Sequence, residues 1–165
     1  HSSDRGASIY NRCEADQIIS ILKQISDCSD FVAELSDLVT KDEAAIGVIC
    51  MYAEQKRLIR QKFNQEVWAD GFKELVKIDT VDSYQGKENR VIIVSITRAD
   101  KHHTTGFLRT PNRINVAMSR AMDRLLIVGN ADIWKGKNKD FSLGRVIDYM
   151  EEHANDDSYK FIVAK

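Results

Sequence analysis

Residues 81–100 read VDSYQGKENRVIIVSITRAD and place a polar, glycine-containing turn directly before an almost unbroken apolar run. The run over 90–97, RVIIVSIT, is rich in β-branched residues, which favour β-strands. Its apolar residues do not alternate with polar ones, and this is typical of a strand that is covered on both faces in a parallel sheet. The stretch therefore predicts an α/β fold in which a buried strand positions the loop before it.

Outside this stretch, apolar runs alternate with helical patterns along the whole chain. We expect further strands at 7–10, 46–52, 75–81, 124–130 and 159–164, and helices at 11–25, 30–39, 53–67, 111–122 and 142–153. Pro111 suits the first turn of its helix, with Thr110 as a possible N-cap. This alternation, with short connections, predicts one open, mostly parallel sheet with helices on both faces.

In a sheet of this kind, ligands bind at the carboxyl ends of the strands. We expect Tyr52, the 82–88 turn, the 98–110 loop and Asn130 at or near such ends. The polar turn in the opening stretch is therefore expected to lie near a ligand.

The bulk composition fits one domain and excludes several classes of protein. The chain has 165 residues, of which 43% are hydrophobic, enough for one sizeable core. Its formal net charge of -1 means that any site for a polyanion must be a local patch. No apolar run approaches the roughly 20 residues of a membrane span, and no signal peptide is recognisable. Three scattered cysteines predict neither a disulfide framework nor a zinc site, so we expect reduced thiols in an intracellular protein.

The polar turn can be interpreted in two ways. Gly86 would let the backbone approach a phosphate, Gln85 could orient a water or a phosphate oxygen, and Glu88 could accept from a ribose hydroxyl. Alternatively, it is an ordinary turn between strands that uses glycine for its dihedral angle, which local composition alone favours.

Two arginines in the helix expected over 111–122 also have two interpretations. Arg113 and Arg120 are seven residues apart, so they would share one face of that helix. A docked helix that holds two arginines in line could meet the spread negative charge of a phosphoryl group. The alternative is two solvated arginines on an exposed flank, since charged residues mostly lie in water.

Four segments resemble motifs of one helicase family and occur in that family's order. VDSYQGKE (81–88) resembles motif V of superfamily 1 helicases, in the branch that includes the nonsense-mediated-decay helicase and senataxin. GFLRTPNRINVAMSRAMDRLLIVGN (106–130) is similar to motif VI of that branch, and IGVICMYAEQ (46–55) to motif IV. YNRCEADQI (10–18) is similar to the Asn-x-x-Glu-Ala segment that opens this lobe. The resemblance covers roughly residues 7–130, and the four motifs are specific as a set.

The resemblance implies a fold and a place in a larger protein. The fold would be a RecA-like three-layer α/β sandwich with a mostly parallel central sheet, in which residues 1–165 form a single domain. That domain would be the C-terminal motor lobe of an ATP-dependent helicase. Because the chain starts with HSSDRG rather than Met, we expect a fragment or an expression remnant rather than a natural start.

The resemblance also implies roles at the nucleotide. Arg120 matches the arginine finger that meets the γ-phosphate, and Gln85 is expected to act with it in catalysis. The expected cofactor-binding residues are Gly86 facing the γ-phosphate, Lys87 beside it, Glu88 on the ribose, and Arg113 supporting the loop network.

Further positions match the family's contacts with nucleic acid. The expected nucleic-acid-binding residues are Thr80, Asp82 and Ser83 from motif V, and Tyr52 and Gln55 from the tail of motif IV. Tyr52 and Gln55 could instead lie at the interface between the lobes. Asn11 and Glu14 match the opening segment, for which we expect a structural or coupling role.

The phosphate-binding motif G-x-x-x-x-G-K-[ST] does not occur in the 165 residues. We therefore expect ATP and Mg²⁺ only in the full-length parent, where a separate N-terminal Walker A/B lobe would hold the Mg²⁺. No metal and no cofactor are expected on this chain alone, and the isolated chain is expected to be inactive. The expected partners are single-stranded nucleic acid (DNA or RNA) and that N-terminal RecA-like lobe, with no membrane.

Two metal-site lookalikes are better explained as solvated segments. Asp42-Glu43-Ala44 resembles the DEAx motif of Walker B, but it precedes its strand, whereas a metal-binding carboxylate belongs at a strand's exit. His102 and His103 are adjacent and lack spaced partners, as in a solvated loop.

Two rival functions remain open. A non-catalytic RecA-like module for binding or scaffolding would keep the fold without the chemistry. A stand-alone Rossmann-type nucleotide binder is disfavoured, because no G-x-G-x-x-G follows any expected strand.

Overall fold

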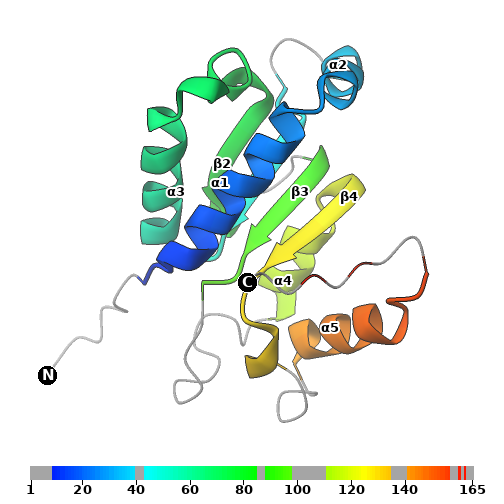
Figure 1. The fold of residues 1–165 in the computed structure, drawn as a ribbon. Coiled ribbons are helices and arrows are strands. Elements are labelled where there is room, and N and C mark those ends of the chain that lie inside the picture. Colours follow the sequence, from blue (N-terminus) through cyan, green and yellow to red (C-terminus); the bar gives the residue numbers. More distant parts are fainter. Residues whose placement is uncertain are drawn as a thin grey trace, which may run out of the picture.

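The computed structural model describes residues 9–39, 43–84, 88–97, 111–134, 141–156, 160 and 162. They form a four-stranded sheet of β1 (Ile46–Cys50), β2 (Val76–Thr80), β3 (Asn89–Ser95) and β4 (Ala121–Val128), in the order β2-β1-β3-β4. Every neighbouring pair is parallel, which confirms the predicted parallel sheet (Figure 1).

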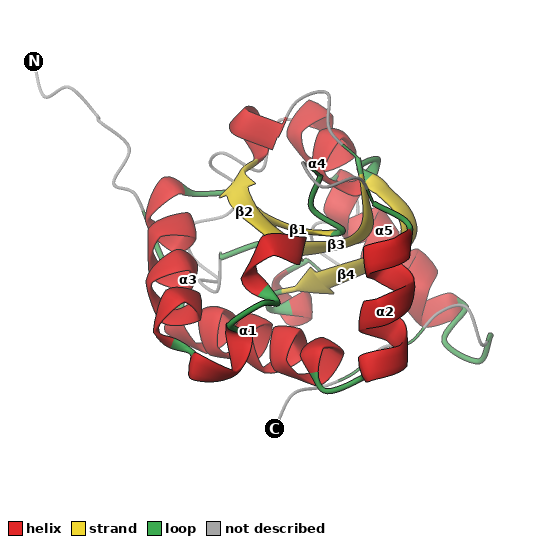
Figure 2. Ribbon diagram, turned by 90° about the horizontal axis from the view of Figure 1, so that it is seen from above, coloured by secondary structure: helices red, strands yellow, loops and turns green. Residues whose placement is uncertain are grey.

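Helices cover both faces of this sheet. They are α1 (Arg12–Ser26), α2 (Ser29–Asp37), α3 (Ala53–Gln65), α4 (Pro111–Met118) and α5 (Ser142–Glu152). Figure 2 shows α1 and α3 on one face and α4 and α5 on the other. This is the predicted three-layer, RecA-like α/β arrangement.

The side chains on the two faces of the central strands β1 and β3 belong to two separate hydrophobic clusters. Val48 and Ile93 pack with α1, α2 and α3, whereas Ile49, Ile92 and Val94 pack with α4 and α5. Alternate side chains of a strand point to opposite faces, so a strand covered on both sides needs apolar residues throughout. All seven residues 91–97 are buried, as their unbroken apolar pattern predicts.

The start and the buried face of α1 follow from its sequence. Asn11 caps α1, and its side-chain oxygen accepts from the backbone N–H of Glu14 at 3.2 Å. Ile18, Ile19 and Leu22 then recur at helical spacing and bury one face of the helix against the sheet.

The connection from β2 to β3 crosses the sheet. β1 lies between these two strands, and the short 3₁₀ turn η3 (Val81–Tyr84) leads from the end of β2 into the crossing. Val81 and Tyr84 of η3 are buried in the same cluster as α4. The 81–88 stretch therefore starts at the carboxyl edge of the sheet and returns to its amino edge.

Three predicted elements differ from the structure. The helix expected over 111–122 ends at Met118, and Ala121 already belongs to β4. Ile9 and Tyr10 form no strand, and the rest of the 7–10 prediction lies outside the described residues. Of the strand expected over 159–164, only Lys160 and Ile162 are described, and neither lies in a strand. None of the helices in the described part of the chain has the length and hydrophobicity that a membrane span requires.

Candidate functional site

The predicted site residues lie at two opposite edges of the sheet. Thr80 ends β2 and Tyr52 follows β1, so both lie at the carboxyl edge. Glu88 directly precedes β3 and Arg120 directly precedes β4, so both lie at the amino edge. Tyr52 and the start of the 82–88 turn thus lie at strand exits as expected, whereas Glu88, the last residue of that turn, lies at the opposite edge.

At the amino edge, the structure brings Glu88 and Arg120 close together. The first residue of β3, Asn89, donates its backbone N–H to the carbonyl of Arg120 at 3.0 Å. The Nε of Arg120 donates to the carbonyl of Val116 in the last turn of α4 at 3.3 Å. Glu88 is exposed, and Arg120 is half-buried. The backbone of this edge thus brings the positions of Glu88 and Arg120 together, while Gln85, Gly86 and Lys87 lie outside the described residues.

Arg113 does not join this pair. Since α4 ends at Met118, the prediction that Arg113 and Arg120 share one face of one helix is wrong. Arg113 lies in the first turn of α4, and its Nε forms an ion pair with Asp82 of η3, at 3.1 Å from Oδ1. The two arginines therefore lie toward opposite edges of the sheet, and Arg113 supports the turn that follows β2.

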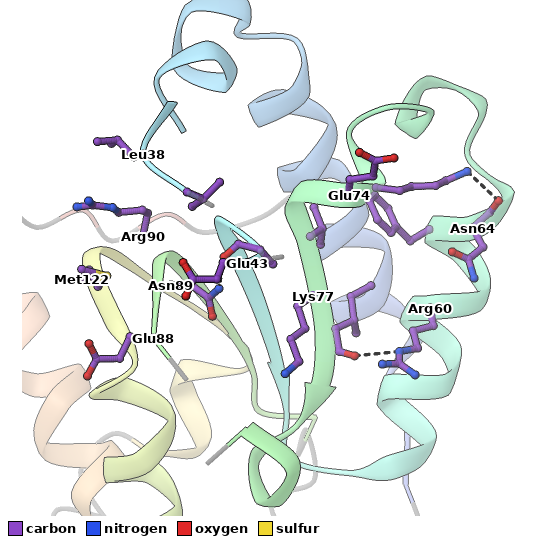
Figure 3. A pocket seen from close by; sticks show the side chains of 16 residues that line it. Leu38, Glu43, Arg60, Asn64, Glu74, Lys77, Glu88, Asn89, Arg90 and Met122 are labelled. Atoms are coloured by element: carbon purple, nitrogen blue, oxygen red, sulfur yellow. Dashed lines mark hydrogen bonds between the residues drawn. The ribbon is translucent and has the colours of Figure 1, made fainter. Parts of the chain in front are cut away.

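A pocket opens at the amino edge beside Glu88. It has a volume of about 1040 Å³. Figure 3 shows Glu88, Asn89, Arg90 and Met122 along one side, with Lys77, Arg60 and Glu74 across from them. Charges of both signs line it, so the pocket suits a polar occupant. Glu43 of the DEAx lookalike also lines it and is exposed, whereas Asp42 lies outside the described residues.

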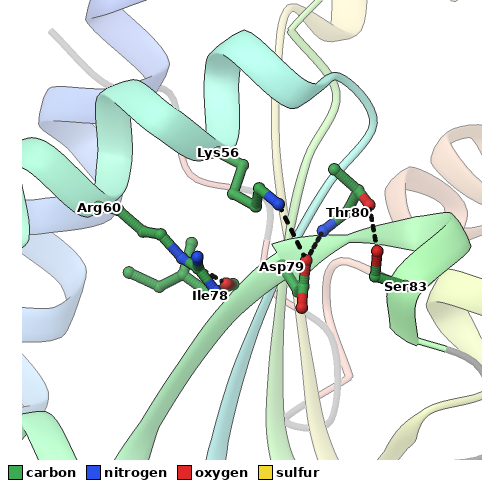
Figure 4. Close-up of polar contacts among 6 residues, drawn as sticks. All are labelled: Lys56, Arg60, Ile78, Asp79, Thr80 and Ser83. Carbon is green, nitrogen blue, oxygen red and sulfur yellow. Dashed lines mark hydrogen bonds and ion pairs between the residues drawn. The ribbon is translucent and has the colours of Figure 1, made fainter.

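At the carboxyl edge, polar side chains surround the end of β2 (Figure 4). The Thr80 hydroxyl donates to the Ser83 Oγ at 3.1 Å, and the Thr80 N–H donates to Asp79 Oδ1 at 2.9 Å. Lys56 of α3 lies 3.3 Å from the same Asp79 oxygen, and Arg60 Nε donates to the Ile78 carbonyl at 2.9 Å. Burial opposes ionisation of Asp79, but the Thr80 N–H and Lys56 outweigh it and lower the pKa of that carboxyl.

Gln55 differs from the prediction that it contacts nucleic acid. Its side chain is fully buried, its Nε2 donates to the Asn11 carbonyl and to Ser95 Oγ, both at 3.1 Å, and its Oε1 accepts from the Asn11 N–H at 2.7 Å. The amide therefore faces the interior, where it ties the start of α1 to β3. Tyr52, three residues earlier, is half-buried.

A second buried polar group completes this interior network. Glu14 is 6% exposed, and its Oε2 accepts from Ser95 Oγ at 3.0 Å and from the Thr97 N–H at 2.7 Å. Burial raises the pKa of Glu14 to about 7, although the hydrogen bonds from Thr97, Ser95 and Asn11 act in the opposite direction. Thr97 has a positive φ of 70°, and the carboxylate holds its N–H in that strained position.

The described residues contain no group of three or more His, Cys, Asp or Glu side chains that could hold a metal ion. The His102-His103 pair lies outside them. Among the described residues, Glu88 offers an acceptor and Arg120 offers donors that could contact a nucleotide.

Sequence reasoning missed the contacts of Tyr84 and Asn89. The Tyr84 hydroxyl donates to Asn89 Oδ1 at 2.7 Å, and Asn89 Nδ2 donates to the carbonyl of Ala44. Tyr84 is fully buried and Asn89 is 6% exposed. The available signal was a polar residue, Asn89, placed at the very start of a buried strand, where it needs partners.

Comparisons with known proteins agree with the four motifs. A family model described as an AAA domain matches residues 1–132. The chain is 35% identical to the putative helicase mov-10-B.1 of Danio rerio over 153 residues, which are 86% of this chain and 14% of that protein. It is 36% identical to the ATP-dependent helicase NAM7 of Saccharomyces cerevisiae over 131 residues, 78% of this chain and 12% of that protein.

A further relative is the helicase sen1 of Schizosaccharomyces pombe. It is 39% identical over 90 residues, which are 54% of this chain and 5% of that protein. The chain thus spans between 5% and 14% of the length of these three relatives.

Proposed function

Because the chain belongs to the AAA-domain family of superfamily 1 helicases, in the branch of the nonsense-mediated-decay helicase and senataxin, we propose that it is the C-terminal motor lobe of an ATP-dependent nucleic-acid helicase. The observation that carries this proposal is that Glu88 and Arg120 are neighbours through the backbone at the amino edge. The Asn89 N–H, 3.0 Å from the Arg120 carbonyl, holds them together.

The amino edge would face a nucleotide that is bound mainly by another lobe. Arg120 would place positive charge near the γ-phosphate, where negative charge spreads during transfer. Glu88 would accept from a ribose hydroxyl, and Gln85, Gly86 and Lys87 would complete this edge. ATP would supply the phosphoryl group, and Mg²⁺ would be held by an N-terminal RecA-like lobe of the same parent, since this chain has no G-x-x-x-x-G-K-[ST].

The carboxyl edge would face single-stranded nucleic acid, DNA or RNA. Thr80, Asp82 and Ser83 lie together at the end of β2, and Tyr52 follows the neighbouring strand β1. Hydroxyl groups at this edge suit the phosphate backbone, so the contact would tolerate different sequences. With nucleotide at one edge and nucleic acid at the other, closing of the two lobes would couple hydrolysis to movement.

Replacement of Arg120 tests this proposal. In the full-length protein that carries this chain, we expect Arg120→Ala to lower ATP hydrolysis by about 10³-fold, the scale of other arginine fingers. Nucleic-acid binding should remain, because Arg120 lies at the other edge of the sheet. Arg145→Ala, which removes an exposed arginine of α5, is the matched control.

Unchanged hydrolysis in Arg120→Ala would exclude Arg120 from this role. If the full-length protein binds nucleic acid but hydrolyses no ATP even with Arg120 in place, the non-catalytic binding or scaffold module becomes the better description.

A further inference from the structure

The start of β4 is not held by regular strand pairing alone. Asn89 pairs with Ala121 and Val91 pairs with Arg124, so β4 has one extra residue between these two pairs. An extra residue of this kind interrupts the ladder and re-aims the neighbouring side chains. Arg120 directly precedes this irregular segment, so its position depends on the contacts of Asn89.

Asn89 joins three separate parts of the chain at this point. Its side chain accepts from the Tyr84 hydroxyl at 2.7 Å and donates to the Ala44 carbonyl, while its backbone N–H donates to the Arg120 carbonyl at 3.0 Å. Glu88 is its neighbour in the chain. Through its backbone N–H and its buried side chain, Asn89 therefore links Arg120, Tyr84 and the turn before β1, next to Glu88.

The absence of a side chain at Gly47 leaves the space that the Tyr84 hydroxyl occupies. Gly47 of β1 lies beneath it, and a Cβ at residue 47 would contact the hydroxyl and lie 2.9 Å from Asn89 Oδ1. Lys77 Nζ lies over the Tyr84 ring, 4.8 Å from its centroid. The Tyr84 hydroxyl is a donor at neutral pH, and burial raises its pKa further above the ordinary value.

We propose that Tyr84 and Asn89 are positioning residues for ATP hydrolysis, and that their hydrogen bond holds Arg120 at the distance from Glu88 that the nucleotide requires. This inference rests on the proposed function of Arg120. It adds two residues that touch no nucleotide and act through the backbone at the start of β4.

Tyr84→Phe in the full-length protein tests the inference, because it removes one hydroxyl and keeps the buried ring. We expect kcat for ATP hydrolysis to fall by roughly tenfold to a hundredfold, the scale of a small misplacement of a catalytic group. The KM for ATP and the affinity for a single-stranded oligonucleotide should stay unchanged, since an interaction made only in the transition state acts on kcat. Tyr149→Phe, at an exposed tyrosine of α5, is the matched control.

A double-mutant cycle separates this inference from the proposed function. Arg120→Lys keeps a positive charge but loses the guanidinium, so it should hydrolyse ATP at a slower but still measurable rate. In the Arg120→Lys background, Tyr84→Phe should lower that rate little further. If Arg120→Lys and Arg120→Ala leave hydrolysis unchanged, the proposed function is wrong.

If these arginine variants slow hydrolysis but Tyr84→Phe does not, only the positioning role is overturned. An equal loss from Tyr84→Phe in both backgrounds would also overturn it, because the hydroxyl would then act independently of Arg120.

Discussion

Glu14 is a buried carboxylate whose partners come from distant parts of the chain. Ser95 and Thr97, which donate to it, are 81 and 83 residues away. The motif resemblance singled out Glu14 and Asn11 and predicted a structural or coupling role. The sequence could not reveal the partners, because a hydrogen bond between α1 and the end of β3 exists only once the helix has packed on the sheet.

The raised pKa of Glu14 predicts a pH-dependent contribution to stability. The folded protein retains the Glu14 proton up to about pH 7, whereas the unfolded chain loses it near pH 4.5. The contribution is therefore fully present below pH 4.5 and is lost as the pH rises to about 7, by at most roughly 3 kcal/mol. Glu14→Gln lacks this titration.

Urea unfolding of the wild-type chain and of Glu14→Gln, at a pH below 4.5 and at a pH above 7, measures the effect. The wild type should lose stability relative to the variant at the higher pH. A difference between the two proteins that does not change with pH would contradict the prediction.

At the scale of elements, α4 shows how tertiary pairing overrides a helical pattern. Ala121 and Met122 continue the apolar stripe of Ile114, Ala117 and Met118, so the sequence predicts a helix that runs through them. In the structure, Ala121 pairs with Asn89 of β3 instead. Helical periodicity depends only on local spacing. The end of α4 depends instead on the pairing of Ala121 with Asn89, 32 residues away in the chain.

Because α4 ends before Arg120, the roles of Arg113 and Arg120 are separate. Arg113 pairs with Asp82 at the carboxyl edge, at 3.1 Å, so its loss should loosen the turn that carries Ser83. We expect Arg113→Ala to weaken oligonucleotide binding several-fold and to leave the KM for ATP unchanged. Equilibrium binding and steady-state hydrolysis of the full-length protein measure both quantities. A raised KM for ATP with unchanged oligonucleotide binding would contradict this prediction and would indicate that Arg113 acts at the nucleotide.

The packing of η3 against β1 predicts a strong effect at Gly47. A Cβ there would meet the Tyr84 hydroxyl and lie 2.6 Å from Ile92 Cδ1, so Gly47→Ala should destabilise the chain by about 1–3 kcal/mol through overpacking. Tyr84→Phe should recover part of this loss, because it removes one of the three close contacts, which are with Tyr84, Ile92 and Asn89. Thermal unfolding of both single variants and the double variant measures the coupling.

Strictly additive losses would show that residues 47 and 84 do not compete for this space. Gly71→Ala is a useful comparison: nothing lies within 4 Å of a Cβ at that position, and its positive φ of 84° makes the backbone alone responsible for any cost.

At the scale of the whole molecule, the structure confirms the parallel, RecA-like sheet that strand and helix alternation predicted. The unbroken run of residue 90 onward was decisive, since only a doubly covered strand tolerates it. The motifs identified the candidate site residues, but they did not predict that these residues divide between two edges of the sheet. That division depends on the 81–88 connection crossing the sheet past β1, which no local pattern encodes.

The two-edge arrangement predicts that the chain alone cannot turn over ATP. Glu88 and Arg120 offer one side of a nucleotide site, and the 165 residues contain no phosphate loop. We expect no steady phosphate release from the purified chain, with or without oligonucleotide, under conditions in which the full-length protein is active. Steady turnover that survives further purification and is lost in Arg120→Ala would contradict the assignment of this chain to one lobe.

The outer side of β2 has a consequence for the protein in concentrated solution. Among the strands that the structure describes, β2 pairs with β1 only, and such edges allow strands of other molecules to add to the sheet. Here Arg60 Nε already donates to the Ile78 carbonyl, and the Thr80 N–H already donates to Asp79 Oδ1. These two contacts therefore oppose the joining of a second sheet along this half of β2.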